Sequence, residues 1–216
     1  MGNGRILAAG GAKDRETALE AARQVLHSGG MVSFPTESFY GLAVDIQNER
    51  AIQRLFEVKR RETDRPVLLL IESIESIEQW AARVSEKALP LMEQYWPGGL
   101  TLVLEASPRL SPLLTANTGK IGLRLSSHPL ARALASRAGG AVTGTSANRS
   151  GQPACRTAQE VLAVLGSEVT LVLDGGETPG GAGSTVLDIV EDPPILLREG
   201  MVSRKALEAC LEERIV

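Results

Sequence analysis

The amino-acid sequence predicts an α/β fold built as a single domain. Apolar runs at residues 67–71 and 169–173 have the length and hydrophobicity of buried strands. Segments with the spacing of amphipathic helices lie between such runs, so strands and helices interleave along the whole chain. No repeat, low-complexity tract or linker divides the 216 residues, a length that suits one large domain. We therefore expect one domain over residues 1–216, with residues 1–13 as a ragged N-terminal extension.

The strands are expected where short apolar runs end in turn-forming residues. One of these strands contains Arg124, and a charge inside a strand is unfavourable unless it meets an anion or a solvated face. Residues 107–119 are rich in Pro, Ser and Thr and are long enough for a lid or a binding loop. The expected strands cover residues 31–34, 67–71, 100–105, 121–125, 141–142, 169–173, 186–190 and 195–197.

Helix signals fall between these strands. Thr17 and Glu20 have the spacing of a capping box in a helix that starts near Asp14. Asn48 is a favourable N-cap for a second helix, whose expected inward residues are Ala51, Ile52, Leu55, Phe56 and Val58. Further helices are expected over residues 74–80, from Ser85, from His128 to Ala138, from Thr157 to Leu165 and from Ser203.

Composition narrows the functional class. Hydrophobic residues make up 43% of the chain and charged residues 23%, which is ordinary for a soluble protein. The net charge of −3 argues against a generally basic nucleic-acid binder but allows a local basic face. Cys155 and Cys210 form no CxxC pair and the chain has two histidines, so the common zinc patterns and a disulfide framework are excluded. Without a signal peptide or an apolar run of membrane-spanning length, we expect a cytoplasmic protein with no membrane partner.

Two clusters of polar residues directly follow expected strands. The first, residues 35–41, contains hydroxyls, a carboxylate and two aromatic rings, and a helix that ends in Lys59-Arg60-Arg61 follows it. The second covers residues 143–151. Polar residues at strand ends are where α/β proteins bind ligands. The three cations alone are also typical of a helix C-terminus, where the helix dipole favours positive charge.

The residue types in and near these clusters predict a phosphate-handling site. Lys59 supplies a point charge and Arg61 a planar fork. Because phosphoryl and nucleotidyl transfer depend mainly on positioning and on stabilisation of charge, no nucleophile is required from the protein. The sequence has no P-loop, no GxGxxG after a strand, no GxSxG and no metal-ligand spacing. Further anion-binding side chains are expected at Arg124, Ser146, Asn148, Ser184, Thr185 and Arg198.

Several short blocks occur in an order that resembles the YrdC/TsaC family of bacterial threonylcarbamoyl-AMP synthases, in its short single-domain form. The resemblance extends from the first helix almost to the last residue. The blocks are residues 35–42, 59–61, 96–101, Arg124, 145–151, 174–176, 184–186 and 197–200.

The resemblance implies a twisted open mixed sheet with flanking helices around a large cationic concave site. It implies a reaction that joins L-threonine, bicarbonate and ATP into threonylcarbamoyl-AMP and releases pyrophosphate. A partner complex would then transfer the threonylcarbamoyl group to an adenosine of tRNA. The resemblance implies no dedicated metal site, since Mg²⁺ would arrive bound to the ATP phosphates.

Residue roles also follow from the resemblance. Lys59 and Arg61 would be the catalytic cations that hold the ATP phosphates and the nascent carbamate. Thr36, Tyr40 and Arg124 would bind threonine, with Arg124 near its carboxylate or near the phosphates. The nucleotide would also contact Ser146, Asn148, Ser184 and Arg198.

Two alternatives use the same residues. A non-catalytic RNA-binding module would bind tRNA or double-stranded RNA in the cationic hollow without needing ATP. A carbamoyl-transfer relative would use another donor, such as carbamoyl phosphate. Leu70 stands where many relatives have a histidine, which leaves the selectivity for threonine over serine open.

Overall fold

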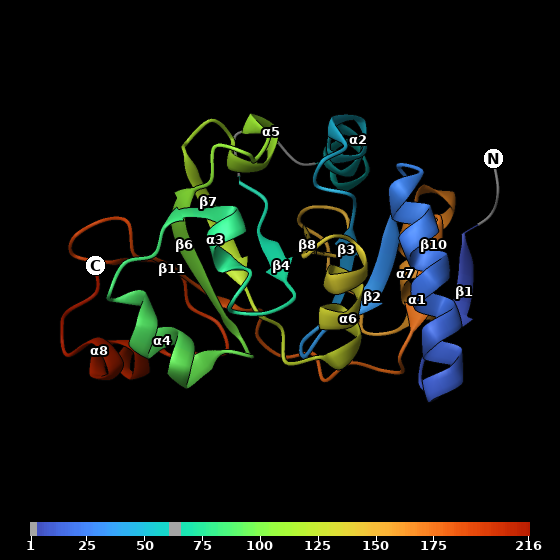
Figure 1. Cartoon of the computed structure of the whole chain (residues 1–216). Helices are drawn as coiled ribbons and strands as arrows, with labels where there is room; N and C mark the ends of the chain where they lie inside the picture. Colours follow the sequence, from blue (N-terminus) through green and yellow to red (C-terminus); the bar gives the residue numbers. More distant parts are fainter. Residues whose placement is uncertain (1–3, 61–65) are drawn as a thin grey trace.

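A computed structural model describes residues 4–60 and 66–216 and shows two mixed sheets side by side with helices around them (Figure 1). The first sheet has five strands in the order β1-β10-β2-β3-β9. Its strands β1, β10 and β2 are parallel, and β3 and β9 continue the sheet antiparallel. These strands are β1 (Arg5–Ala8), β2 (Val32–Pro35), β3 (Tyr40–Ala43), β9 (Thr145–Ser146) and β10 (Leu171–Asp174).

The second sheet has seven strands and supplies most of the regular structure near the candidate site. Six follow the order β12-β11-β6-β7-β4-β8, and β5 pairs with β6. The strands are β4 (Leu69–Ile71), β5 (Ala81–Arg83), β6 (Leu100–Ala106), β7 (Lys120–Arg124), β8 (Ala141–Thr143), β11 (Thr185–Asp188) and β12 (Ile195–Arg198).

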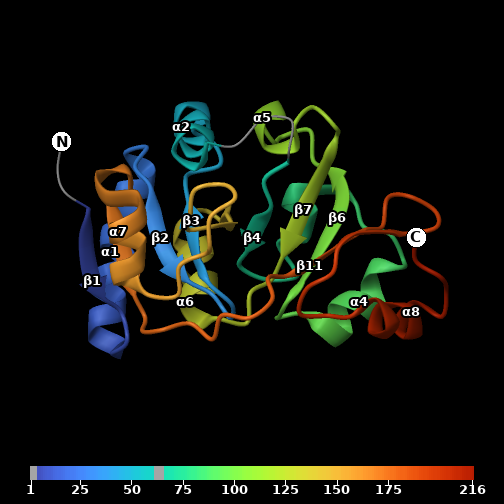
Figure 2. The ribbon, with the colours of Figure 1, turned by 180° about the vertical axis from the view of Figure 1, so that it is seen from behind.

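Helices cover both faces of the five-stranded sheet. Helices α1 and α6 pack against one face in Figure 1, and the view from behind shows α7 on the other (Figure 2). Helices α4 and α8 pack together beside the seven-stranded sheet. The helices are α1 (Ala12–His27), α2 (Glu49–Lys59), α3 (Ile77–Trp80), α4 (Ala88–Tyr95), α5 (Pro112–Thr115), α6 (Pro129–Arg137), α7 (Ala158–Leu165) and α8 (Arg204–Leu211). None of the helices in the described part of the chain is long and apolar enough to cross a bilayer.

The two sheets are joined where the chain passes from β8 to β9. Strand β8 is an edge of the seven-stranded sheet and β9 is an edge of the five-stranded one, with Gly144 between them. The amide of Gly144 donates to Leu68 O at 2.9 Å. A Cβ at Gly144 would lie 2.7 Å from Leu68 Cδ1 and 2.7 Å from Leu70 Cγ, so a side chain does not fit there without displacing both leucines. The glycine therefore lets the chain leave β8 close against the neighbouring β4 segment on its way to β9.

The hydrophobic core forms two clusters. The larger one includes residues of both sheets, such as Leu42 and Leu102, and the inward face of α2. The smaller one packs α1 and α6 against the five-stranded sheet through residues such as Leu19, Phe34 and Leu134. All five residues of α2 that the sequence predicted to face inward are buried, and Asn48 caps this helix as predicted by accepting a hydrogen bond from Ala51 N at 3.1 Å.

The expected mixed α/β fold with flanking helices is confirmed, and some local expectations are wrong. The expectation of a ragged extension is wrong for the described residues 4–13, because β1 pairs with β10 and α1 already begins at Ala12. Thr17 lies inside α1 and donates to Lys13 O, so it is not a cap.

Two further expectations fail around the seven-stranded sheet. The helix expected over residues 74–80 is reduced to the single turn of α3, because the chain then enters β5 to pair with β6. The expected loop 107–119 contains the short helix α5, which Ser111 caps.

Candidate anion-binding site

A cavity of about 780 Å³ contains the candidate site, and one face of the seven-stranded sheet lines much of it. Because side chains alternate along a strand, alternate residues of β6, β7 and β11 contribute to this lining, on β6 those of its first half. The turn between β2 and β3, the end of α2 and the segment after β9 complete it. From these three strands come Thr101, Val103, Lys120, Gly122, Arg124, Val186 and Asp188, and Ser184 directly precedes β11.

The site residues predicted from the sequence come together in this cavity. Arg61 lies outside the described residues. Thr185, also expected to bind an anion, is not part of the lining, because its buried hydroxyl donates to Val202 O at 2.6 Å. The other eight all belong to the lining. They come from both sheets and from positions far apart in the chain. They are Thr36, Tyr40, Lys59, Arg124, Ser146, Asn148, Ser184 and Arg198.

Lys59 is the last residue of α2, and its side chain turns into the protein rather than toward solvent. Only 3% of Lys59 is exposed. Its Nζ donates to Asn148 O at 2.9 Å, to Asn148 Oδ1 at 2.8 Å and to Ser146 O. Stabilisation of a helix C-terminus therefore does not account for this lysine, since its ammonium group holds the segment after β9 beside the cavity.

Ser146 and Asn148 are linked to each other as well as to Lys59. Ser146 Oγ donates to Asn148 Oδ1 at 2.7 Å, and Asn148 Nδ2 donates to the carbonyl of Gln152. The Asn148 side chain therefore shapes this segment, whereas Ser146 Oγ remains able to accept a hydrogen bond from a ligand.

Thr36 lies in the turn between β2 and β3, and Tyr40 begins β3. Thr36 Oγ1 donates to Phe39 O at 2.7 Å and accepts from the amide of Ser38 at 3.2 Å, so it closes the turn. The hydroxyl of Tyr40 donates to Gly176 O at 2.8 Å. Burial and the nearby Asp174 carboxylate raise the pKa of Tyr40, which keeps the phenol protonated.

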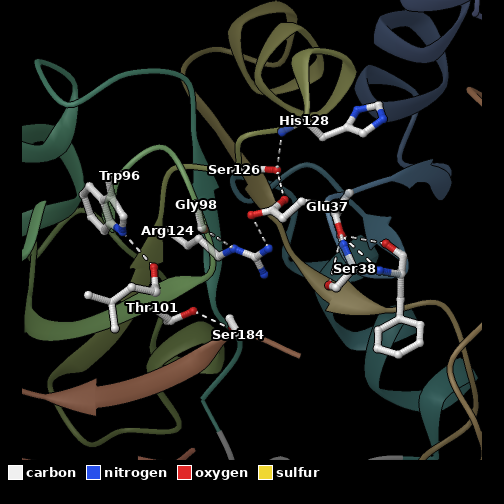
Figure 3. A network of polar contacts seen from close by, with 12 residues as sticks. Glu37, Ser38, Trp96, Gly98, Thr101, Arg124, Ser126, His128 and Ser184 are labelled. Atoms are coloured by element: carbon white, nitrogen blue, oxygen red, sulfur yellow. Dashed lines mark hydrogen bonds and ion pairs between the residues drawn. The ribbon is translucent and has the colours of Figure 1, made fainter. Parts of the chain in front are cut away.

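Two arginines reach the cavity from the seven-stranded sheet. Arg198 donates through Nε and Nη2 to Ser184 O, at 3.0 and 2.8 Å, and through Nη2 to Ser184 Oγ at 3.1 Å. Thr101 Oγ1 also donates to Ser184 Oγ, at 2.9 Å (Figure 3). Partial burial of the guanidinium and the like charge of Arg124 lower the pKa of Arg198. An anion between the two guanidinium groups would relieve their repulsion, so this part of the cavity favours an anionic ligand.

Arg124 is held by a carboxylate to which the sequence assigned no role. Arg124 Nη2 lies 2.5 Å from Glu37 Oε1, and Arg124 Nε donates to Gly98 O at 3.0 Å. Ser126 Oγ donates to Glu37 Oε2 at 2.5 Å, and the amide of His128 donates to Ser126 Oγ (Figure 3). Burial alone would raise the pKa of Glu37, but Arg124 and the Ser126 hydroxyl outweigh it, so the pKa lies below its usual value.

Sequence reasoning also missed an ion pair in the cavity lining. Lys120 Nζ lies 2.8 Å from Asp188 Oδ2 and 2.6 Å from Glu191 Oε1. Lys120 lies four residues before Arg124 on β7, and Asp188 lies four residues after Ser184. Because side chains of a strand alternate between its two faces, residues four apart point to the same side. This rule could have placed Lys120 beside Arg124 and Asp188 beside Ser184. Among the residues that the structure describes, no cluster of three His, Cys, Asp or Glu side chains could hold a metal ion.

Comparisons with known proteins place this arrangement in a family. The Sua5/YciO/YrdC family model, described as "Telomere recombination", matches residues 24–200. A threonylcarbamoyl-AMP synthase of Bacillus subtilis is 38% identical over 191 residues, which cover 88% of this chain and 55% of the relative. A threonylcarbamoyl-AMP synthase of Vibrio vulnificus is 36% identical over 159 residues, covering 73% of this chain and 86% of the relative.

Solved structures have the same fold. The crystal structure of Pyrococcus abyssi Sua5 complexed with L-threonine superposes with a TM-score of 0.91 at 34% identity, covering 98% of this chain and 62% of that one. Escherichia coli YciO superposes with a TM-score of 0.85 at 24% identity, covering 94% and 99% of the two chains, a likeness that concerns the fold alone. The chain spans 55% and 58% of the lengths of its Bacillus subtilis and Pyrococcus abyssi relatives. With the family model matching most of its residues, the chain belongs to the Sua5/YciO/YrdC family.

Proposed function

We propose that this protein is a threonylcarbamoyl-AMP synthase, a nucleotidyltransferase. Its substrates would be L-threonine, bicarbonate and ATP. The threonine nitrogen and bicarbonate would give a carbamate and water, and a carbamate oxygen would attack the α-phosphorus of ATP. The bond from that phosphorus to the β-phosphate would break, with pyrophosphate as the leaving group. Relatives that carry this activity in their names support the proposal.

The observation that carries the proposal is the convergence of cations and hydroxyls on one cavity. Lys59, Arg124 and Arg198 come from different parts of the fold, and all three line the same space. A nucleotidyl transfer develops negative charge on oxygen atoms, so groups positioned in this way would stabilise its transition state. Arg61 would add a further cation, as the sequence predicts.

The substrates can be assigned to parts of the cavity. The hydroxyls of Ser146 and Ser184 would bind the nucleotide together with Arg198, and Asn148 would hold the segment that carries Ser146. Thr36 in the turn before β3 and Tyr40 at the start of β3 would border threonine, with Arg124 close to its carboxylate or to the phosphates. Mg²⁺ would enter on the ATP phosphates and supply charge neutralisation there.

The cellular role follows from the proposed chemistry. A mixed anhydride of a carbamate and AMP is reactive, so its consumer would be a group-transfer step. As the sequence resemblance implies, tRNA and a threonylcarbamoyl-transfer complex would be the partners, and the cytoplasm would be the location.

The test is pyrophosphate release by the purified protein. With ATP, bicarbonate and L-threonine we expect release that stops when threonine is omitted. Arg198→Gln should reduce this rate by about 10²-fold, because it removes a charge that stabilises the developing anion. The matched control is Arg137→Gln, which removes an exposed arginine of α6 paired with Glu16, and its rate should equal that of the wild type. Release that is independent of threonine, or none at all from folded protein, would contradict the proposal.

A further inference from the structure

Glu37 is a charged residue beside the cavity that takes no part in the proposed reaction. The cavity lining includes its neighbours Thr36 and Ser38 but, within the described part of the chain, does not include Glu37. Both of its carboxylate oxygens face protein groups, Oε1 toward Arg124 and Oε2 toward Ser126. Glu37 therefore lies between Arg124 and Ser126 and contacts both (Figure 3).

The contacts of Arg124 determine which way its guanidinium faces. Nε is bound to Gly98 O, and Nη2 faces Glu37. Nη1 makes no hydrogen bond to any residue within 4–60 or 66–216. Because the guanidinium is planar, fixing Nε and Nη2 also fixes the direction of Nη1. Nη1 is thus the group that Arg124 offers to a ligand in the cavity.

The same contact connects the two sheets. Glu37 lies in the turn between β2 and β3 of the five-stranded sheet, whereas Arg124 ends β7 of the seven-stranded sheet. Only 5% of Arg124 is exposed, and the Glu37 side chain is 11% exposed, so little water competes for the pair. A charged contact of this kind is sensitive to small changes in the length of either side chain.

We propose that Glu37 is a positioning residue, which fixes the guanidinium of Arg124 so that Nη1 binds the anionic part of a ligand. The proposal depends on the proposed function only in taking the ligand to be an anion. Its test therefore measures ligand binding rather than catalytic turnover. The result can be interpreted even if the protein shows no synthase activity.

The direction of the effect separates positioning from simple charge. Glu37→Gln keeps the shape of the side chain and removes one negative charge. If Glu37 acted only through its charge, the variant would bind anions more tightly, because the cavity would become more positive. Positioning predicts the opposite, a dissociation constant about tenfold higher, since the buried ion pair that orients Arg124 is lost.

The measurement is isothermal titration calorimetry with two probes, inorganic pyrophosphate for a phosphate and L-threonine for a carboxylate. Arg124→Met shows which probe Arg124 binds, and Glu37→Gln is read with that probe. The double variant should bind no more weakly than Arg124→Met alone, because Glu37 acts through Arg124. The control is Glu16→Gln. Glu16 on α1 forms an exposed ion pair with Arg137, so this variant loses the same charge away from the cavity and should bind the probe as wild type does.

Several results would overturn the proposal. One is that Glu37→Gln binds the probe as tightly as wild type or more tightly. Another is that the double variant binds more weakly than Arg124→Met, by the product of the two single losses. A third is that Arg124→Met changes the dissociation constant of neither probe. If Glu37→Gln does not fold, Ser126→Ala replaces it, because this variant keeps the charge of Glu37 and removes the hydroxyl that orients Oε2. We expect Ser126→Ala to weaken binding about threefold, and unchanged binding would contradict the proposal.

Discussion

At the scale of single residues, Lys59 has two roles: it places a positive charge at the cavity, and it donates hydrogen bonds to the segment after β9 that lines the cavity. Its ammonium group satisfies Asn148 and Ser146, and it lines the space in which an anion would lie. We expect Lys59→Ala to lower threonine-dependent pyrophosphate release by about 10²-fold or more, since a stabilising charge is lost. The free energy of unfolding should fall by about 1–3 kcal/mol because buried acceptors lose their donor. Urea unfolding and the release assay measure the two effects.

The control for Lys59 is Lys205→Ala on the exposed surface of α8. It removes the same side chain far from the cavity lining and should change neither quantity appreciably. If Lys59→Ala released pyrophosphate at the same rate as Lys205→Ala, Lys59 would have no part in the reaction.

Glu37 gives the protein a specific sensitivity to acid. Arg124 and Ser126 hold the folded-state pKa of Glu37 below its usual value despite burial. A depressed pKa contributes stability that is present above the unfolded value of about 4.3 and is lost as the pH falls toward the folded-state pKa. Between about pH 5 and pH 3, wild type should therefore lose more free energy of unfolding than Glu37→Gln. Urea unfolding at each pH checks this, and parallel losses in the two proteins would show that Glu37 does not contribute.

At the scale of secondary structure, sequence patterns predicted most helices and strands but missed those set by distant partners. The inward face and the Asn48 cap of α2 follow from local spacing and capping chemistry, which the sequence carries directly. In contrast, Arg5–Ala8 become a strand only because β10, far along the chain, lies beside them. The same holds for β5, whose pairing with β6 ends the expected helix after one turn.

The crossing from β8 to β9 passes close to Leu68 and Leu70 at Gly144. Gly144→Ala should lower the free energy of unfolding by about 1–3 kcal/mol, because the new Cβ would collide with Leu68 and Leu70. Both leucines also line the cavity, so ligand binding should weaken as they move. Urea unfolding measures the stability change. Gly10→Ala is the control, since a Cβ at Gly10 meets nothing within 4 Å, and equal losses in the two variants would contradict the steric explanation.

At the scale of the whole molecule, the sequence predicted the members of the site better than their arrangement. Lys59, Ser146 and Arg198 could be selected because their side chains suit an anion and follow apolar segments. That Lys59 binds the segment around Asn148, and that Glu37 holds Arg124, could not be predicted because these contacts depend on how two sheets meet. Arg61 lies outside the described residues, so its role remains a prediction.

The central claim is that one nucleotide lies among side chains from both sheets. A crystal structure of the protein with ATP and L-threonine tests this most directly. We predict phosphates within hydrogen-bonding distance of Lys59, Arg198 and Ser184, with threonine beside the turn that carries Thr36. A nucleotide bound elsewhere, with the cavity between the sheets left to solvent, would contradict the account.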